Sequence, residues 1–119
     1  MSAGVWFGLG KNVMDDGGTA VILDYARNQI LITTTRTFNI LDARSFYFTK
    51  DTYHLRVFAH EKTVEVYLDD DFLLHHLMNY REGCVALMTE SGSASFENTV
   101  LHRVRSFQEI QGNLYDTDI

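Results

Sequence analysis

The sequence predicts an all-β protein, a two-layer antiparallel β-sandwich. The 119 residues fall into short apolar or alternating runs separated by Gly, Asn and Asp, which is the pattern of sandwiches and barrels. Little in the chain favours a helix, and the short connections suit antiparallel neighbours rather than helical crossovers of about a dozen residues. Residues 1–110 are therefore predicted to form a single β-sandwich domain, and the polar residues 111–119 a C-terminal tail that frays.

The N-terminal part is expected to supply three strands and a short fourth. Residues 4–9 (GVWFGL), 19–24 (TAVILD) and 29–35 (QILITTT) are rich in apolar, aromatic and β-branched side chains. The Asn, Asp and Gly residues of segment 12–18 predict a loop. Residues 38–48 are apolar at both ends and polar in the middle, which indicates a loop with one short strand.

The clearest pattern is YHLRVFAHEKTVEVYLDDD, residues 53–71, which predicts two alternating strands joined by a short turn. One face of this hairpin is aliphatic and carries Leu55, Val57, Ala59, Val64, Val66 and Leu68. The other face is polar and aromatic and carries His54, Arg56, Phe58, Glu65 and Tyr67. Such alternation is typical of a sheet with one buried face.

The C-terminal part is expected to add three more strands. Residues 72–78 (FLLHHLM) could be strand or helix by periodicity alone, and the neighbouring strands favour β. Residues 83–88 (GCVALM) form a clear strand, and residues 93–104 (SASFENTVLHRV) a long final one. The total is about nine to ten strands.

Composition and charge exclude several classes of function. A hydrophobic fraction of 45% and an aromatic fraction of 13% indicate an ordered globular protein. The formal charge of −6 argues against a nucleic-acid or an anionic membrane partner. No run approaches the roughly 20 apolar residues of a membrane span, and the N-terminus lacks a signal-peptide pattern. A cytoplasmic location is the expectation if Met1 is the native start.

Metal and cofactor signals are weak. Cys84, the single cysteine, excludes an intrachain disulfide and is expected to be a small buried hydrophobe. Asp69, Asp70 and Asp71 could offer oxygen ligands to calcium, but a solvated turn is favoured because Asp tolerates left-handed backbone angles. The five histidines show no metal-ligand spacing, and no phosphate-loop or dinucleotide motif occurs. No metal and no cofactor is therefore expected.

Exposed aromatic side chains are the best candidates for a ligand site. Aromatic rings stack on the apolar faces of sugar rings while polar neighbours bond the hydroxyls. Trp6, Tyr67 and Tyr80 are the predicted carbohydrate-binding residues. A less favoured alternative is a small hydrolase that uses Glu65 and Glu97, since a glycosidase needs two carboxyl groups about 5 to 9.5 Å apart.

The hairpin LRVFAHEKTVEVYLDDD resembles the C-terminal β-sandwich module of glycoside hydrolase family 32, the invertases, levanases and sucrose-6-phosphate hydrolases. GSASFENTVLHRV (residues 92–104) is similar to the closing strand of such concanavalin-like jelly rolls, and LDYARNQILI (residues 23–32) to an earlier strand pair. His60, Lys62 and Asp71 depart from the family pattern, which usually has Asp, Ser and Gly there.

The resemblance implies a non-catalytic accessory module. In that family the chemistry resides in an N-terminal propeller whose motifs contain proline, and this chain has no proline. No catalytic residue can be carried over to this chain. The implied partner is the catalytic propeller of an enzyme acting on sucrose or fructans, with a sugar and a second copy of the chain as further options. The alternative function is a stand-alone lectin-like carbohydrate-binding module.

Overall fold

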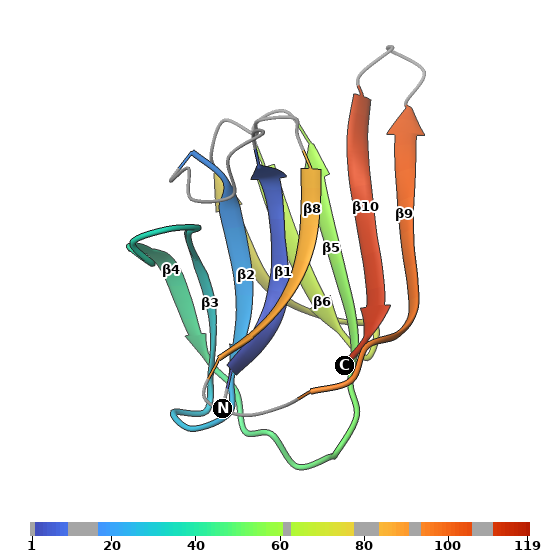
Figure 1. Ribbon diagram of the computed structural model, residues 1–119. Coiled ribbons are helices and arrows are strands. Elements are labelled where there is room, and N and C mark those ends of the chain that lie inside the picture. Colours follow the sequence, from blue (N-terminus) through green and yellow to red (C-terminus); the bar gives the residue numbers. More distant parts are fainter. Residues whose placement is uncertain (1, 10–16, 61–62, 78–83, 91–93, 106–110) are drawn as a thin grey trace. The chain divides into compact units, whose positions relative to one another are not determined.

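A computed structural model describes residues 2–9, 17–60, 63–77, 84–90, 94–105 and 111–119. Over these ranges the chain contains ten strands and no helix, and the strands form two antiparallel sheets of five (Figure 1). The predicted all-β class is therefore confirmed. Within the described ranges, no helix has the length and apolar character needed to cross a membrane.

All the predicted strands are present, and their ends differ from the prediction by a few residues. The bounds are β1 Ser2–Leu9, β2 Thr19–Asp24, β3 Gln29–Thr34, β4 Ile40–Ser45, β5 His54–His60, β6 Thr63–Leu68, β7 Asp71–Leu77, β8 Cys84–Glu90, β9 Glu97–Arg105 and β10 Gln111–Asp118. The ambiguous segment after the hairpin is thus the strand β7, as its neighbours indicated. The side chain of Cys84 lies outside the described part of the structure.

Residue contacts divide the chain into two compact units, each built on one sheet. Unit 1 comprises residues 1–49 and 81–94, and its strands lie in the order β4-β3-β2-β1-β8 (Figure 1). Unit 2 comprises residues 50–80 and 95–119, with the order β7-β6-β5-β10-β9. The single domain expected for residues 1–110 stays a prediction.

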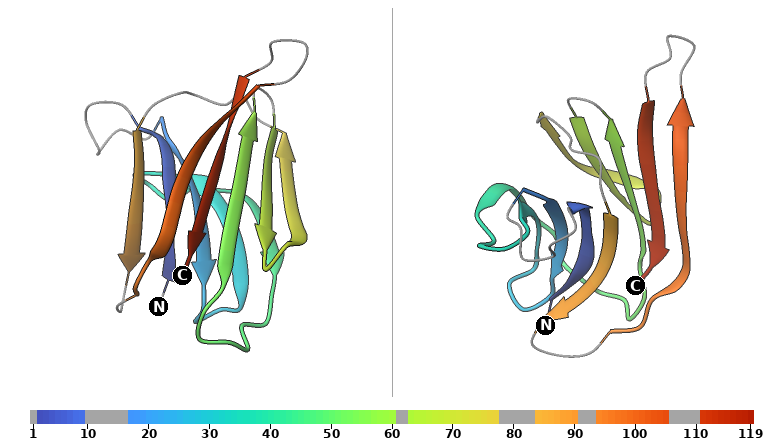
Figure 2. Two further views of the ribbon diagram at one scale, coloured as in Figure 1. Left: turned by 90° about the vertical axis from the view of Figure 1, so that its right-hand side faces the viewer. Right: turned by 45° about the horizontal axis from the view of Figure 1, so that its top comes forward.

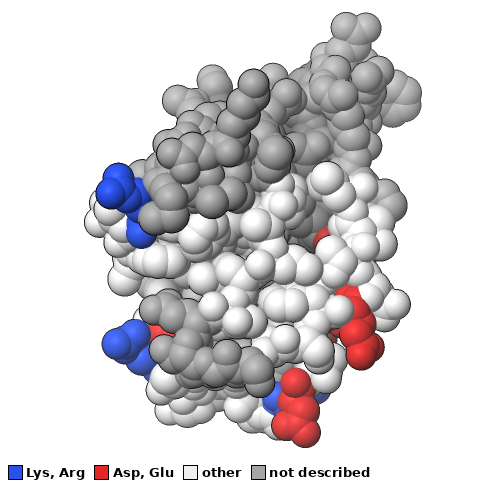
Figure 3. All heavy atoms as spheres, in the orientation of Figure 1, with Lys and Arg blue, Asp and Glu red and all other residues white. Residues whose placement is uncertain are grey.

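In unit 1 the strand β2 is buried along its whole length, which agrees with the four apolar residues 20–23 at its centre. Ala20 and Ile22 form one cluster with Leu31, and the partly buried Trp6 and Phe38 pack against it. Figure 3, in the orientation of Figure 1, shows mostly uncharged atoms over the described part of this sheet. Nothing in this cluster is charged, so it is held by apolar packing.

In unit 2 the strand β10 replaces the predicted C-terminal tail. It pairs with β5 on one side and β9 on the other, and Figure 2 shows it as the dark-red strand between the green and orange ones. Ile119 also exchanges two backbone hydrogen bonds of 2.6 Å with Tyr53. The prediction of a fraying tail was wrong because backbone hydrogen bonds to two neighbouring strands do not depend on apolar side chains.

The alternation predicted for the hairpin is confirmed. The aliphatic face is buried, with exposures of 0% for Val57 and Val66 and 2% for Leu68. The turn from β6 to β7 consists of Asp69 and Asp70, whose φ angles are 50° and 68°. Two successive left-handed residues are the mark of a type I′ hairpin turn. The predicted turn role is therefore confirmed for Asp69 and Asp70, whereas Asp71 is the first residue of β7.

Candidate functional site

The unburied face of the unit 2 sheet carries the candidate site; we call it the open face. Its side chains come from the positions that alternate with the buried aliphatic residues of β5 and β6. Register pairing aligns one residue from each of four adjacent strands on this face: Phe72, Tyr67, Arg56 and Asp116. We call these four residues the cross-strand row. It brings two aromatic rings next to a cation and a carboxylate.

The aromatic half of the row is fixed by its own contacts. The rings of Tyr67 and Phe72 meet edge to face, with centroids 5.6 Å apart, and Phe72 is 50% exposed. The Tyr67 hydroxyl donates a 2.8 Å hydrogen bond to Glu65, and this bond raises the pKa of Tyr67 above its usual value. The ring of Tyr67 is therefore held in place from two sides.

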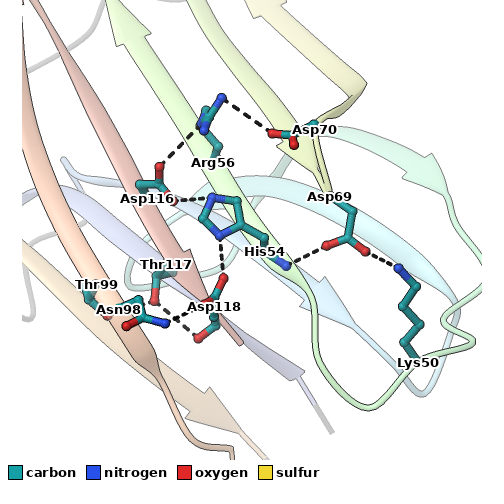
Figure 4. A network of polar contacts seen from close by, with 10 residues as sticks. All are labelled: Lys50, His54, Arg56, Asp69, Asp70, Asn98, Thr99, Asp116, Thr117 and Asp118. Carbon is teal, nitrogen blue, oxygen red and sulfur yellow. Dashed lines mark hydrogen bonds and ion pairs between the residues drawn. The ribbon is translucent and has the colours of Figure 1, made fainter.

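The polar half of the row continues into a network centred on His54 (Figure 4). The imidazole lies between two carboxylates of β10: Nε2 contacts Asp116 and Nδ1 contacts Asp118. Asn98 donates from its amide to the second carboxylate oxygen of Asp118, at 3.0 Å. The hydrogen bond from Asn98 and then the one from His54 lower the pKa of Asp118, so this group stays an anionic acceptor.

Arg56 joins the network to the row. Its Nε lies 3.5 Å from Asp116 Oδ2, and its Nη1 lies 3.6 Å from Asp70 Oδ1. The Arg56 Nε and Asp116 Oδ1 atoms are buried, and neither makes a hydrogen bond within the described part of the structure. Their contacts are ion pairs only. The Arg56 side chain remains 40% exposed and that of Asp70 79%. The outer part of the guanidinium is thus accessible and held only by a weak surface pair.

Asp69 fixes the start of β5 from the turn. One carboxylate oxygen accepts the backbone N–H of His54 at 2.8 Å, and the other accepts from Lys50 Nζ at 2.7 Å. Burial raises the pKa of Asp69, but the bonds from Lys50 and His54 outweigh it and the net shift is downward. The β6–β7 turn is thereby tied to the strand that presents His54 and Arg56.

The three predicted carbohydrate-binding residues do not lie together in the structure. Tyr67 lies in the cross-strand row. Trp6 belongs to unit 1, where its ring meets that of Phe38 with centroids 5.8 Å apart, and so it is not part of the row. Its Nε1 atom is buried and has no hydrogen-bond partner among the described residues. Tyr80 lies outside the described residues.

The proposed carboxylate pair of a small hydrolase is not formed. The strands β5 and β10 separate β6, which carries Glu65, from β9, which carries Glu97. Three strand spacings of about 4.8 Å place the two strands roughly 14 Å apart, beyond the range of a glycosidase pair. The strands that carry Glu65 and Glu97 are therefore not neighbours. Among the described residues, no group of three His, Cys, Asp or Glu side chains could hold a metal.

Comparison with known proteins bears on the fold. No protein-family model matches the sequence, and no curated protein matches it either. The structure is similar to a solved structure described as the carbohydrate-binding module CBM66 from Bacillus subtilis. The fold is shared with a carbohydrate-binding module. The TM-score is 0.60 and the identity 12%, over 99% of this chain and 60% of that one.

The likeness agrees with the predicted β-sandwich class and does not transfer a ligand or a binding residue. This chain spans about 60% of the length of that module. Membership of glycoside hydrolase family 32 stays a prediction, since no family model matches.

Most of the site was missed from the sequence. Asp116 and Asp118 fell in the segment taken for a tail, and the pairing of β10 with β5 is what brings them to Arg56 and His54. One signal was present in the sequence. His54 and Arg56 are two residues apart, as are Asp116 and Asp118, and this spacing puts each pair on one face of a strand.

Proposed function

We propose that this chain is a carbohydrate-binding module whose ligand lies on the open face of unit 2. The observation that carries the proposal is the fold shared with a carbohydrate-binding module over 99% of the chain. The cross-strand row supports it independently, because an aromatic surface beside fixed donors and acceptors is what sugar binding requires.

Each half of the row has a distinct role in this proposal. The half-exposed ring of Phe72 and the ring of Tyr67 supply an apolar surface for a sugar ring. Arg56 offers outward donors, while Asp116 and Asp118 offer acceptors to hydroxyl groups. Charged partners make stronger hydrogen bonds than neutral ones, so a few hydroxyl contacts suffice for specificity.

The finer proposal is an accessory module of a glycoside hydrolase that acts on sucrose or fructans. It rests on the resemblance of the β5–β6 hairpin to the family 32 C-terminal module. In this role the chain stabilises a catalytic propeller, contacts its sugar, and offers a surface to a second subunit. The stand-alone lectin-like module is the second candidate. Propeller motifs in the reading frame upstream of Met1 would support the accessory role over it.

Calorimetric titration with sucrose, inulin and levan tests sugar binding. We expect saturable heat that Tyr67→Ala weakens at least tenfold, because the stacking surface is lost. Tyr47→Ala is the matched control, since this tyrosine is 80% exposed and belongs to unit 1. Trp6→Ala and Tyr80→Ala test the other two predicted residues. Absence of heat with all three sugars would overturn the proposal.

A further inference from the structure

We propose that the open face binds an internal stretch of a linear sugar chain, about three to four units long, which lies across the strands of unit 2 from β7 to β9. The inference rests on the proposed function and adds to it the length of the ligand and the direction in which it lies. It also assigns a contact to Val100, a residue of the edge strand β9.

The cross-strand row continues onto the fifth strand of the sheet. Directly paired residues of antiparallel strands share a face, and the register pairs Asp116 with Val100. Val100 therefore follows Phe72, Tyr67, Arg56 and Asp116 on the open face, and it is 43% exposed. We call these five residues the extended row. Every strand of the sheet contributes one residue to it.

Both ends of the extended row are accessible. Phe72 lies on β7 and Val100 on β9, and these are the two edge strands of the sheet. The two side chains are apolar and about half exposed, at 50% and 43%. A site that takes the end of a chain needs a wall against which the chain stops. A row that is accessible at both edges instead lets a chain continue in either direction.

The middle of the extended row is polar. Arg56 and Asp116 lie between the aromatic rings and Val100, and Figure 4 shows their side chains meeting between β5 and β10. The Arg56 side chain is 40% exposed and that of Asp116 17%. This order of apolar, polar and apolar surface suits a chain whose rings pack at two places and whose hydroxyls are bonded between them.

The dimensions of the sheet set the number of sugar units. Five adjacent strands are separated by four spacings of about 4.8 Å, so the extended row is about 19 Å long. Since a sugar ring spans roughly one such spacing, the row accommodates about three to four linked rings. A disaccharide covers about half of the row. We expect it to occupy the half that carries Phe72 and Tyr67, where the apolar contact is largest.

Calorimetric titration with fructan oligosaccharides of two to five units tests the length of the site. We expect the affinity to rise with each added unit up to about four units and then to level off. Equal affinity for the disaccharide and the tetrasaccharide would overturn the inference and leave the proposed function intact. Absence of heat with every oligosaccharide and with the polymers would overturn the proposed function, and the inference with it.

The stoichiometry of binding to inulin distinguishes an internal stretch from a chain end. Inulin is a linear chain, so a module that recognises an end has the same number of sites on a short chain and on a long one. A module that binds internal stretches gains sites as the chain lengthens. With inulin fractions of increasing length, we expect the number of modules bound per chain to increase. A constant number would overturn the inference.

Val100→Ala and Leu101→Ala form a matched pair that tests the contact on β9. The two residues are neighbours, 43% and 58% exposed, and successive residues of a strand point to opposite faces, so Val100 lies on the open face and Leu101 does not. Val100→Ala removes two methyl groups from the contact and should weaken tetrasaccharide binding roughly fivefold, with no change for the disaccharide. Leu101→Ala should change neither. A tetrasaccharide affinity that Val100→Ala leaves unchanged, or that Leu101→Ala lowers equally, would overturn the inference.

Discussion

Substitutions of Asp69 separate three contributions that this residue makes to unit 2. The residue has a left-handed φ of 50°, its carboxylate accepts the His54 N–H, and it pairs with Lys50. Asp69→Asn keeps the backbone preference and an acceptor oxygen and removes only the exposed ion pair, which predicts a loss below about 1 kcal/mol. Asp69→Gly keeps the backbone angle and removes the hydrogen bond, at about 1 kcal/mol. Asp69→Ala adds a left-handed penalty of about 1–2 kcal/mol, so its predicted loss is about 2–3 kcal/mol.

Urea denaturation followed by tryptophan fluorescence measures these losses. With a slope of about 2 kcal/mol per molar urea, Asp69→Ala should lower the midpoint by roughly 1 to 1.5 M, and the Asn variant by less than about 0.5 M. The order Asn, Gly, Ala follows from the turn geometry. Equal midpoints for the Gly and Ala variants would refute the argument that the left-handed angle is costly here.

Three further predictions concern packing and pH. Leu55→Ala removes a side chain with 0% exposure and should lower the free energy of unfolding in urea by about 3 kcal/mol. Leu77→Ala removes a side chain with 71% exposure and should lower it by less than about 0.5 kcal/mol. Similar losses for the two variants would contradict the assigned faces. Gly4→Ala would place a Cβ atom 2.0 Å from the backbone oxygen of Val21, so we expect a loss of about 3 kcal/mol or more, and an unchanged thermal midpoint would argue against this close approach. The pKa of Asp69 is lower in the folded protein than in the unfolded chain. Its carboxylate therefore contributes to stability above the unfolded-state pKa of about 3.9, and this contribution is lost as pH falls through the folded-state pKa. The stability difference between wild type and Asp69→Asn should therefore shrink between pH 5 and pH 2, and a difference that grows would show the sign to be wrong.

The strands of this protein were predictable where side chains alternate or are uniformly apolar. The strand TVEVYL alternates and the strand TAVILD has an apolar centre, and burial follows each pattern residue by residue. The strand β10 was not predictable in this way. Its sequence, QGNLYDTD, is mostly polar, and its strand conformation depends on the hydrogen bonds of β5 and β9. Pairing between segments about 55 residues apart leaves no local trace in a sequence.

The candidate site was predictable only for its aromatic part. The alternation of the hairpin placed Tyr67 on the unburied face, and the structure joins it to Phe72 across the turn. The polar part required knowledge of the strand order, since His54 and Arg56 meet Asp118 and Asp116 only through β10. Topology, rather than composition, creates that cluster.

The position of β10 between β5 and β9 has a consequence for biosynthesis. Until residues 111–118 are made, β9 has no neighbour in its sheet, and the hairpin of β5 and β6 ends in an open edge. Open strand edges invite pairing with other chains, so the nascent protein is exposed to aggregation until residues 111–118 emerge. Termination before residue 111 would therefore give a product in which β9 and the β7-β6-β5 strands lack the strand that joins them.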